Sequence, residues 1–418
     1  MTDHAEEVPF DPLDARFIAD PYPAYDRVRD ASGAWRRDGD PLWYLTRYAD
    51  VHAAFRDRRL GVTYSHRYAP EELGVPDGVP AWRDARWQAF AAFERWELLN
   101  LEPPVHTRLR RLVTEAFTPR TVEGMRAGLV ERARTLLAPG RAAGRVDLAA
   151  DYAQAFSLGI ICDLIGVAAQ DRETIKRLSD QTVAMYEPSP SDAQRAASDA
   201  AAGEFRRYLL DVLATRRRRP AADLLTALID ATVDGERLTD DQIVSTAMVL
   251  LMAGHEATVN ATSNGVAALA ASPGEWQRIR RGEVPPRAAL EEILRFDPPL
   301  QWFARWVLDE GLVVDGTPIP VGSRVALVLA AANRDPRRWP EPTRFDLRRA
   351  DTGHLTFGGG IHFCLGAPLA RLELETTLTE LARSEDELVI LAPTERRPTF
   401  QFRGYEHLTI ALGSPDRP

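Results

Sequence analysis

The chain has 418 residues, of which 45% are hydrophobic and 27% are charged, and its formal net charge is −9. This size and composition exclude a fibrous or disordered protein and allow one large buried core or two smaller ones. The negative charge argues against a dedicated nucleic-acid-binding protein, although the arginine run at residues 216–219 leaves a local basic patch.

The two cysteines, Cys162 and Cys364, lie far apart in the sequence. The sequence therefore predicts neither a disulfide framework nor a multi-cysteine zinc site. Residues 1–14 are acidic and lack the basic-then-apolar pattern of a signal peptide, and the most apolar internal run, residues 247–254, is shorter than the ~20 residues of a membrane helix. We expect a soluble, cytoplasmic protein with no membrane segment.

The spacing of apolar residues is mostly helical along the chain. In chain order it predicts a strand at 42–46, helices at 122–137, 151–165, 205–217 and 239–271, strands at 311–314 and 324–329, a helix at 365–382 and a strand at 407–412. The predicted fold class is mainly α with small peripheral β-sheets. We expect a single domain over residues 1–418, with its β-richer parts near residues 40–65, 311–330 and 398–412.

The helix predicted at residues 239–271 is the longest. A capping box formed by Thr239 and Gln242 opens it, and a Ser-Pro-Gly sequence at residues 272–274 closes it. The helix is apolar on nearly every side, which is typical of a buried helix. Its polar or small residues, Gly254, Glu256 and Asn260, therefore need a specific reason to be there.

A glycine-rich loop precedes the helix predicted at residues 365–382. Residues 357–366 read Phe-Gly-Gly-Gly-Ile-His-Phe-Cys-Leu-Gly, so three glycines stand shortly before Cys364. A cysteine at a helix N-terminus meets unpaired N–H groups and the positive end of the helix dipole, which favour a thiolate able to bind a metal. Without these surroundings, a single cysteine is more often a small buried hydrophobic residue.

This loop resembles the heme-binding loop of the cytochrome P450 family, Phe-x-x-Gly-x-His-x-Cys-x-Gly. Four more segments match family motifs in the same order: His-Thr-Arg-Leu-Arg at 106–110, Glu-Ile-Leu-Arg at 292–295, Asn-Arg-Asp-Pro at 333–336 and Glu-Pro-Thr-Arg-Phe at 341–345. The resemblance implies the cytochrome P450 fold, a single triangular-prism-like unit with a long central helix. It also implies a heme b cofactor (iron protoporphyrin IX) whose iron is bound by Cys364.

The resemblance implies further roles for individual residues. It assigns the contacts to the heme propionates to His106, Arg110, Arg305 and His362. Other residues around the cofactor would be Phe357, Gly358, Ala253 and Gly254. The motifs also imply a structural ion-paired triad, made of Glu292, Arg295 and Arg344. His354 lies close to the loop but receives no role.

Residues 253–258, Ala-Gly-His-Glu-Ala-Thr, resemble the family's oxygen-binding motif, which implies catalytic roles for Glu256, Ala257 and Thr258. Glu256 would relay protons or pair with a nearby arginine as a gate. Ala257 departs from the family, where a threonine hydroxyl at this position helps deliver protons to bound oxygen. Three explanations stay open: a substrate hydroxyl or water replaces it, Thr258 reaches inward, or the chemistry depends less on oxygen insertion. We favour the first.

The resemblance implies a monooxygenase that hydroxylates or epoxidises a hydrophobic small molecule in bacterial specialised metabolism. Regions that face substrate in the family contain several aromatic residues, which suggest an aromatic substrate if they do not belong to the core: Trp82, Trp87, Phe90, Phe93, Trp96, Trp302 and Phe303. The predicted pocket residues are Gln301, Trp302 and Phe303. Residues 187–191 would form either a mobile lid or an ordinary turn. Alternatives are aromatic coupling or other radical chemistry without oxygen insertion, and a non-catalytic heme sensor or recruitment module.

No reductase-like segment is fused to the chain. The resemblance therefore implies an external electron donor, a ferredoxin with an NAD(P)H-dependent reductase. It would dock near Cys364, where Arg108, Arg111 and Arg371 offer positive charge. We expect neither a nucleic-acid partner nor a membrane.

Overall fold

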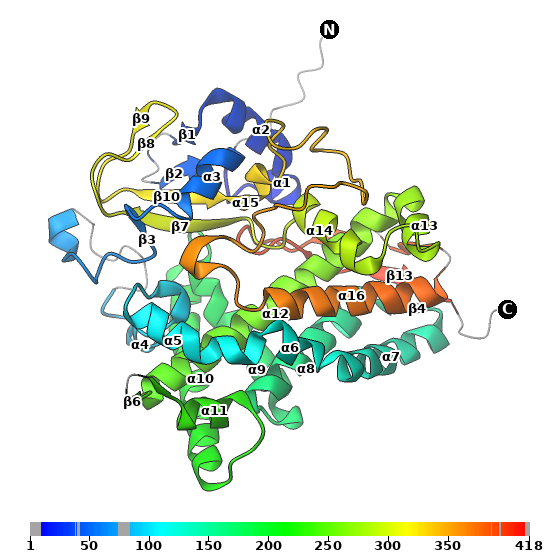
Figure 1. The fold of residues 1–418 in the computed structure, drawn as a ribbon, viewed down its shortest axis with the longest axis horizontal. Coiled ribbons are helices and arrows are strands. Elements are labelled where there is room, and N and C mark those ends of the chain that lie inside the picture. Colours follow the sequence, from blue (N-terminus) through cyan, green and yellow to red (C-terminus); the bar gives the residue numbers. More distant parts are fainter. Residues whose placement is uncertain are drawn as a thin grey trace.

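The computed structural model describes residues 10–37, 39, 42–73, 84–233, 235–385, 387–392 and 394–413. Most helices gather on one side of the molecule and the largest β-sheet lies on the other (Figure 1). The longest helix, α12 (Asp240–Ala270), runs through the middle. The predicted fold class, mainly α with small sheets, is confirmed.

The element bounds define this architecture. The helices are α1 (Ala15–Ala19), α2 (Tyr22–Ala31), α3 (Tyr48–Ala54), α4 (Gln88–Glu94), α5 (Val105–Thr114), α6 (Pro119–Glu123), α7 (Arg126–Ala143), α8 (Gln154–Ile165), α9 (Arg172–Val183), α10 (Asp192–Arg218), α11 (Leu224–Asp230), α12, α13 (Pro273–Arg280), α14 (Pro286–Phe296), α15 (Leu329–Ala332) and α16 (Ala367–Ser384). The strands are β1 (Ala34–Trp35), β2 (Leu42–Leu45), β3 (Leu60–Gly61), β4 (Arg145–Asp147), β5 (Thr232–Val233), β6 (Glu236–Arg237), β7 (Trp302–Val307), β8 (Val313–Val314), β9 (Thr317–Pro318), β10 (Arg324–Val328), β11 (Glu395–Arg396), β12 (Tyr405–His407) and β13 (Thr409–Ala411).

Helix α12 begins as its sequence predicts. The Thr239 hydroxyl accepts the N–H of Gln242 at 3.3 Å, and the Gln242 side chain accepts the N–H of Thr239 at 3.0 Å, which forms the expected capping box. Some of its buried polar side chains tie it to distant segments. Asn264 donates to the carbonyls of Asp297 and Arg403, at 3.1 and 2.9 Å.

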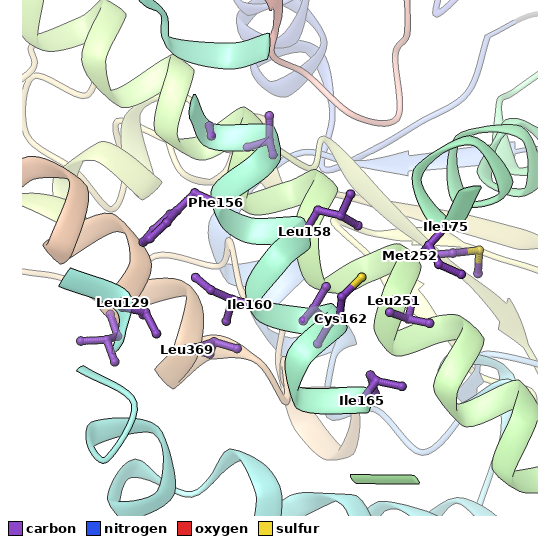
Figure 2. Packing of buried hydrophobic residues seen from close by; sticks show 14 of the residues in the cluster. Leu129, Phe156, Leu158, Ile160, Cys162, Ile165, Ile175, Leu251, Met252 and Leu369 are labelled. Carbon is purple, nitrogen blue, oxygen red and sulfur yellow. The ribbon is translucent and has the colours of Figure 1, made fainter. Parts of the chain in front are cut away.

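Helix α8 packs against α12 in the helical core (Figure 2). A Cβ added to Gly254 would lie only 2.7 Å from Ile161, so Gly254 allows the two helices to approach closely. Cys162 is fully buried there among apolar side chains. Among the described residues, one helical stretch, Leu148–Ile165, is long and apolar enough to cross a membrane, but 67% of it is buried inside the molecule.

The largest sheet has the strand order β1-β2-β10-β7-β3. Strands β2 and β10, which the sequence predicted, pair in parallel, and β10 pairs with β7 in antiparallel register. The sequence analysis did not predict β7, because its Trp-Phe-Ala-Arg-Trp-Val sequence shows no regular alternation of apolar and polar residues. Strands also occur within residues 40–65, 311–330 and 398–412, while the single domain stays a prediction.

A buried ion pair joins α14 to the segment that leads to the cysteine loop. The carboxylate of Glu292 accepts two bonds from Arg295, at 2.7 and 2.8 Å, and both side chains are almost fully buried. Arg295 also donates to the carbonyls of Asn333, Pro342 and Arg344, at 2.8, 3.0 and 3.3 Å. Each buried charge is therefore compensated by a partner, as a stable buried pair requires.

The structure corrects the third member of this group. The side chain of Arg344 is 53% exposed and pairs with the exposed Glu341, so only its backbone carbonyl contacts Arg295. The second arginine at Glu292 is Arg349, whose Nε lies 3.2 Å from Oε2 and whose side chain is 12% exposed. The sequence pattern pointed to Arg344, but the turn at residues 341–349 directs the later arginine inward.

We expect Arg349→Gln to lower the free energy of unfolding by about 3 kcal/mol, because it leaves part of a buried carboxylate uncompensated. Urea denaturation followed by circular dichroism would measure this loss. The matched control is Arg344→Gln, which removes an exposed charge and should cost less than about 0.5 kcal/mol. Equal losses in the two variants would contradict the assignment of Arg349.

Candidate functional site

The cysteine loop has a backbone that only glycine tolerates at two positions. Gly358 and Gly360 have φ angles of 69° and 65°, in the left-handed region that side chains disfavour. A Cβ on Gly360 would lie 2.1 Å from the carbonyl oxygen of Phe55, just beyond α3. The N–H of Cys364 donates to the carbonyl of Phe357 at 2.9 Å, which closes the loop.

Cys364 stands three residues before the first residue of α16, at the N-terminal end of that helix. Burial raises the pKa of Cys364, whereas N–H donors from Gly366 and Ala367 and the charges of Arg110 and Arg371 lower it. These donors favour the thiolate, but burial outweighs them and keeps the pKa of Cys364 above its ordinary value in the protein alone. Among the described residues no group of three or more His, Cys, Asp or Glu side chains could hold a metal ion. A metal at Cys364 would therefore depend on a cofactor for its other ligands.

Four nitrogen-bearing side chains from three separate segments converge near this loop. The rings of His106, on α5, and His362 lie 4.3 Å apart. Burial lowers the pKa of His106 to about 4, aided by Arg110. Burial lowers that of His362 to about 2, aided by His106, Arg305 and Arg110. All four groups are therefore close enough to repel one another when charged.

This cluster has the features of an anion site. Both ring nitrogens of His106 and of His362 are buried and have no hydrogen-bond partner in the part of the chain that the structure describes. Burial lowers the pKa of Arg305 to about 10, and its Nη1 donates to the carbonyl of Ala304 at 2.8 Å. Within the described ranges, neither Arg305 nor Arg110 has a carboxylate within ion-pairing distance. Buried donors of this kind fit the two propionates of a heme, with Cys364 as the iron ligand.

The middle of α12 faces open space along one stripe. Ala253 is exposed and Ala257, one turn on, is half-buried, as is Gly254, although the residues at 251, 252, 255, 256 and 258 are buried. These two small side chains would line the cofactor side of the helix. Gly254 contributes differently, since its missing side chain accommodates Ile161 of α8. Thr258 is buried, 5% exposed, with its carbonyl bonded to the Thr262 hydroxyl.

Glu256 is buried beside this stripe and pairs with an arginine from the C-terminal part of the chain. Its Oε1 lies 3.1 Å from Nη1 of Arg397. Burial raises the pKa of Glu256 to about 7, and Arg397 opposes that rise while Asp180 and Glu187 add to it. A carboxyl group with such a pKa can both accept and release a proton near neutral pH.

The three predicted pocket residues do not lie together. Successive side chains of a strand point to opposite faces, and Trp302 packs with Tyr44 and Phe400 in the core beneath the sheet. Phe303 faces the other way, toward Phe55, with the Arg305 guanidinium 5.9 Å from its ring. We therefore do not propose Trp302 as a pocket residue.

Gln301 is also occupied within the fold, because its amide donates to the carbonyl of Pro298 and accepts the hydroxyl of Tyr25, each at 3.0 Å. In the segment before α5, Trp87, Phe90 and Phe93 are buried core residues. Trp82 lies outside the described residues. Phe303 is the predicted pocket residue that remains beside the cysteine loop.

Two of the arginines predicted at the docking face are already ion-paired. Arg108 pairs with the exposed Glu236 at 2.8 Å, and Arg371 donates to both oxygens of Glu291. Neither Arg349 nor Arg397 lies in a motif, so the sequence alone does not indicate a role for them. Arg397 meets Glu256 only through the folding of the chain's last segment across α12.

Comparisons with known proteins agree with this geometry. The family model for cytochrome P450 matches residues 59–282 and 287–384. Vitamin D(3) 25-hydroxylase of Pseudonocardia autotrophica is 36% identical over 405 residues, 95% of each chain. 6-Deoxyerythronolide B hydroxylase of Saccharopolyspora erythraea is 35% identical over 402 residues, 95% of this chain and 97% of that protein.

Solved structures extend the likeness to three dimensions. P450BioI, solved in complex with an acyl carrier protein ligated to hexadec-9Z-enoic acid, has a TM-score of 0.87 and 30% identity, covering 95% of this chain and 100% of that one. The family uses heme, which the donor cluster and Cys364 fit. The chain belongs to the cytochrome P450 family and is a heme-dependent monooxygenase.

Proposed function

We propose that this enzyme hydroxylates or epoxidises a hydrophobic small molecule that carries a hydroxyl group close to the oxidised carbon. The observation that carries the proposal is Ala257, which stands half-exposed on the cofactor side of α12 beside the buried Glu256. A methyl group can neither donate nor accept a hydrogen bond. The missing hydroxyl must then come from the substrate or from a water that the substrate holds.

The bound heme supplies iron-based oxygen activation, and the chain's own residues supply the surroundings. Cys364 would bind the iron, and His106, Arg110, Arg305 and His362 would hold the propionates, beside Phe357 and Gly358. Glu256, with a pKa raised to about 7 by burial, is the proposed proton donor to the pocket, and Arg397 holds it in place. Thr258 is buried, which supports a packing role more than a proton-transfer role.

The relatives support hydroxylation more than the alternatives. Both curated relatives described above are named as hydroxylases. Coupling or other radical chemistry remains the second candidate, since an alanine at position 257 is also compatible with weaker dependence on oxygen insertion. We further propose that the enzyme works in the cytoplasm, within specialised metabolism, on an apolar substrate that contacts Phe303.

We propose that a ferredoxin, reduced by an NAD(P)H-dependent reductase, docks over the cysteine loop. Ile361 and Phe363 of this loop are 50% and 44% exposed, which is unusual for large apolar side chains. Arg56, at the end of α3, is exposed and lines the same surface hollow as Phe363. An apolar centre with a positive rim fits an acidic partner.

A buried carboxyl group ties the segment before α5 to the proposed lid. Glu97 is 2% exposed, and its Oε2 accepts the Tyr186 hydroxyl and the Asn100 amide, each at 2.6 Å. Tyr186 ends the short helix η7 (Ala184–Tyr186), directly before residues 187–191. Burial raises the pKa of Glu97 to about 8, so the neutral form predominates near pH 7.

The substrate-hydroxyl proposal predicts the effect of Ala257→Thr. A ligand screen would first identify a substrate. With an analogue that lacks the substrate's hydroxyl group, the wild-type enzyme should form at least about 10-fold less product per electron consumed. Ala257→Thr should restore that ratio with the deoxy analogue, because it returns a hydroxyl to α12. The control Ala257→Val adds similar bulk and should restore nothing. Equal wild-type ratios for both compounds would contradict the proposal.

The docking proposal predicts that Arg56→Glu raises the KM for an acidic ferredoxin several-fold while ligand binding to the pocket stays unchanged. The KM of the wild type should rise with salt, because screening weakens the attraction. The control Arg145→Glu reverses an exposed charge on β4, away from the loop (Figure 1). An effect of equal size in this control would argue against the proposed face.

The Glu97 contact predicts a specific pH dependence of stability. The folded-state pKa, about 8, lies above the ordinary 4.5, so the folded protein binds this proton more tightly and loses stability as the pH rises between those values. Glu97→Gln stays neutral and should flatten that part of the profile of melting temperature against pH, with a higher Tm than wild type at pH 9. Glu131→Gln, exposed on α7, should keep the wild-type profile. If the melting temperature of Glu97→Gln changed with pH in parallel with that of the wild type, the raised pKa of Glu97 would be refuted.

A further inference from the structure

Glu291, the residue before the structural Glu292, receives donors from two sides. Arg371 of α16 donates its Nε to Oε1 at 2.6 Å and its Nη2 to Oε2 at 2.9 Å. Nε2 of His354 lies 3.1 Å from Oε2. Burial alone raises the pKa of Glu291, but these donors hold it at about 2. Glu291 is therefore an anion at any working pH.

The proton on His354 can be assigned from its neighbours. The backbone N–H of Thr356 donates to Nδ1 at 3.2 Å, so Nδ1 accepts and Nε2 carries the proton that it donates to Glu291. The His354 side chain is 2% exposed. A buried imidazole with both nitrogens engaged is held in one orientation, and it belongs to the segment that enters the cysteine loop.

Arg371 extends the contact to the loop itself. Its guanidinium carbon lies 4.4 Å from the centre of the Phe357 ring, a cation–π distance. Phe357 in turn accepts the N–H of Cys364 at its carbonyl. His354, Glu291 and Arg371 therefore form a connected unit, here called the Glu291 triad. Its Arg371 contacts Phe357, which is hydrogen-bonded to the N–H of the cysteine.

We propose that the Glu291 triad positions Phe357 and balances the charge behind Cys364, and so sets the reduction potential of the heme iron. The Glu291–Arg371 pair is neutral as a whole, and either residue alone would leave one unit of charge beside the thiolate. A positive charge favours the electron-rich ferrous state, and a negative charge disfavours it. The proposal rests on Cys364 as the proposed ligand of the heme iron, and it does not depend on the substrate or ferredoxin assignments.

This geometry also explains why Arg371 is unsuited to the docking role expected from the sequence. A guanidinium bonded through Nε and Nη2 to one carboxylate presents little free positive charge to a partner. Its side chain is 31% exposed, so a partner could cover it without using its charge. The role proposed here is a positioning role, exerted through Phe357 and through the field at Cys364.

The test uses the heme-loaded protein and measures its reduction potential by spectroelectrochemistry. Glu291→Gln should raise the potential, because Arg371 is left uncompensated, and Arg371→Gln should lower it, because Glu291 is left uncompensated. The double variant should return close to the wild-type potential. A role limited to packing would shift both single variants in the same direction, which would overturn the proposal, as would the absence of a shift in both.

A matched control and a conservative variant guard against simple misfolding. Glu375→Gln removes another ion-paired carboxylate of α16, whose partner Arg126 lies 3.2 Å away, and should leave the potential unchanged. Arg371→Lys keeps the positive charge and should stay near wild type even if Arg371→Gln fails to incorporate heme. The absorbance of the ferrous carbon monoxide complex reports thiolate ligation in each variant. A shift in Arg371→Lys equal to that in Arg371→Gln would overturn the charge-based role.

Discussion

The buried guanidinium of Arg295 is the contact on which the rest of the site depends. It neutralises Glu292 on its own helix and takes up three backbone carbonyls from the segment between β10 and the cysteine loop. A charged group buried this completely is stable only if nearly every donor is used. The pair therefore fixes the path of a long irregular segment, which apolar contacts alone would leave loosely specified.

That path continues into the cysteine loop through side-chain amide and hydroxyl bonds. Asn333 accepts the N–H of Leu355 and donates to the Thr356 hydroxyl, which bonds to the carbonyl of Leu294 on α14. The loop is thus attached to the same helix that carries Glu291 and Glu292. The two neighbouring carboxylates on α14 therefore have different roles: Glu292 stabilises the fold, and Glu291 faces the cysteine loop.

The electrostatics around Cys364 follow one principle, which is that positive charge gathers where negative charge will be held. Arg110 and the Arg371–Glu291 ion pair lie near Cys364. Arg110, Arg305, His106 and His362 surround the position proposed for the propionates. Burial disfavours the charged forms of Arg110 and Arg305 in isolation, and it keeps the rings of His106 and His362 neutral near neutral pH. Burying these groups without anionic partners is unfavourable for the protein alone, which indicates that an anionic cofactor completes the fold. On the opposite side of the pocket, Glu256 and Arg397 balance each other within the protein.

The sequence by itself determined the helical fold class, the long capped helix, the cysteine loop and the buried Glu292–Arg295 pair, because these depend on local spacing, capping and glycine geometry. Only the tertiary structure decided that Arg349 replaces Arg344 at Glu292, that Trp302 faces away from Phe303, that Gly254 accommodates Ile161, and that His354 and Arg371 meet on Glu291. In each of these cases the partner comes from a distant segment or the opposite face of a strand. Local sequence periodicity carries no information about such partners, which are set by how the whole chain packs.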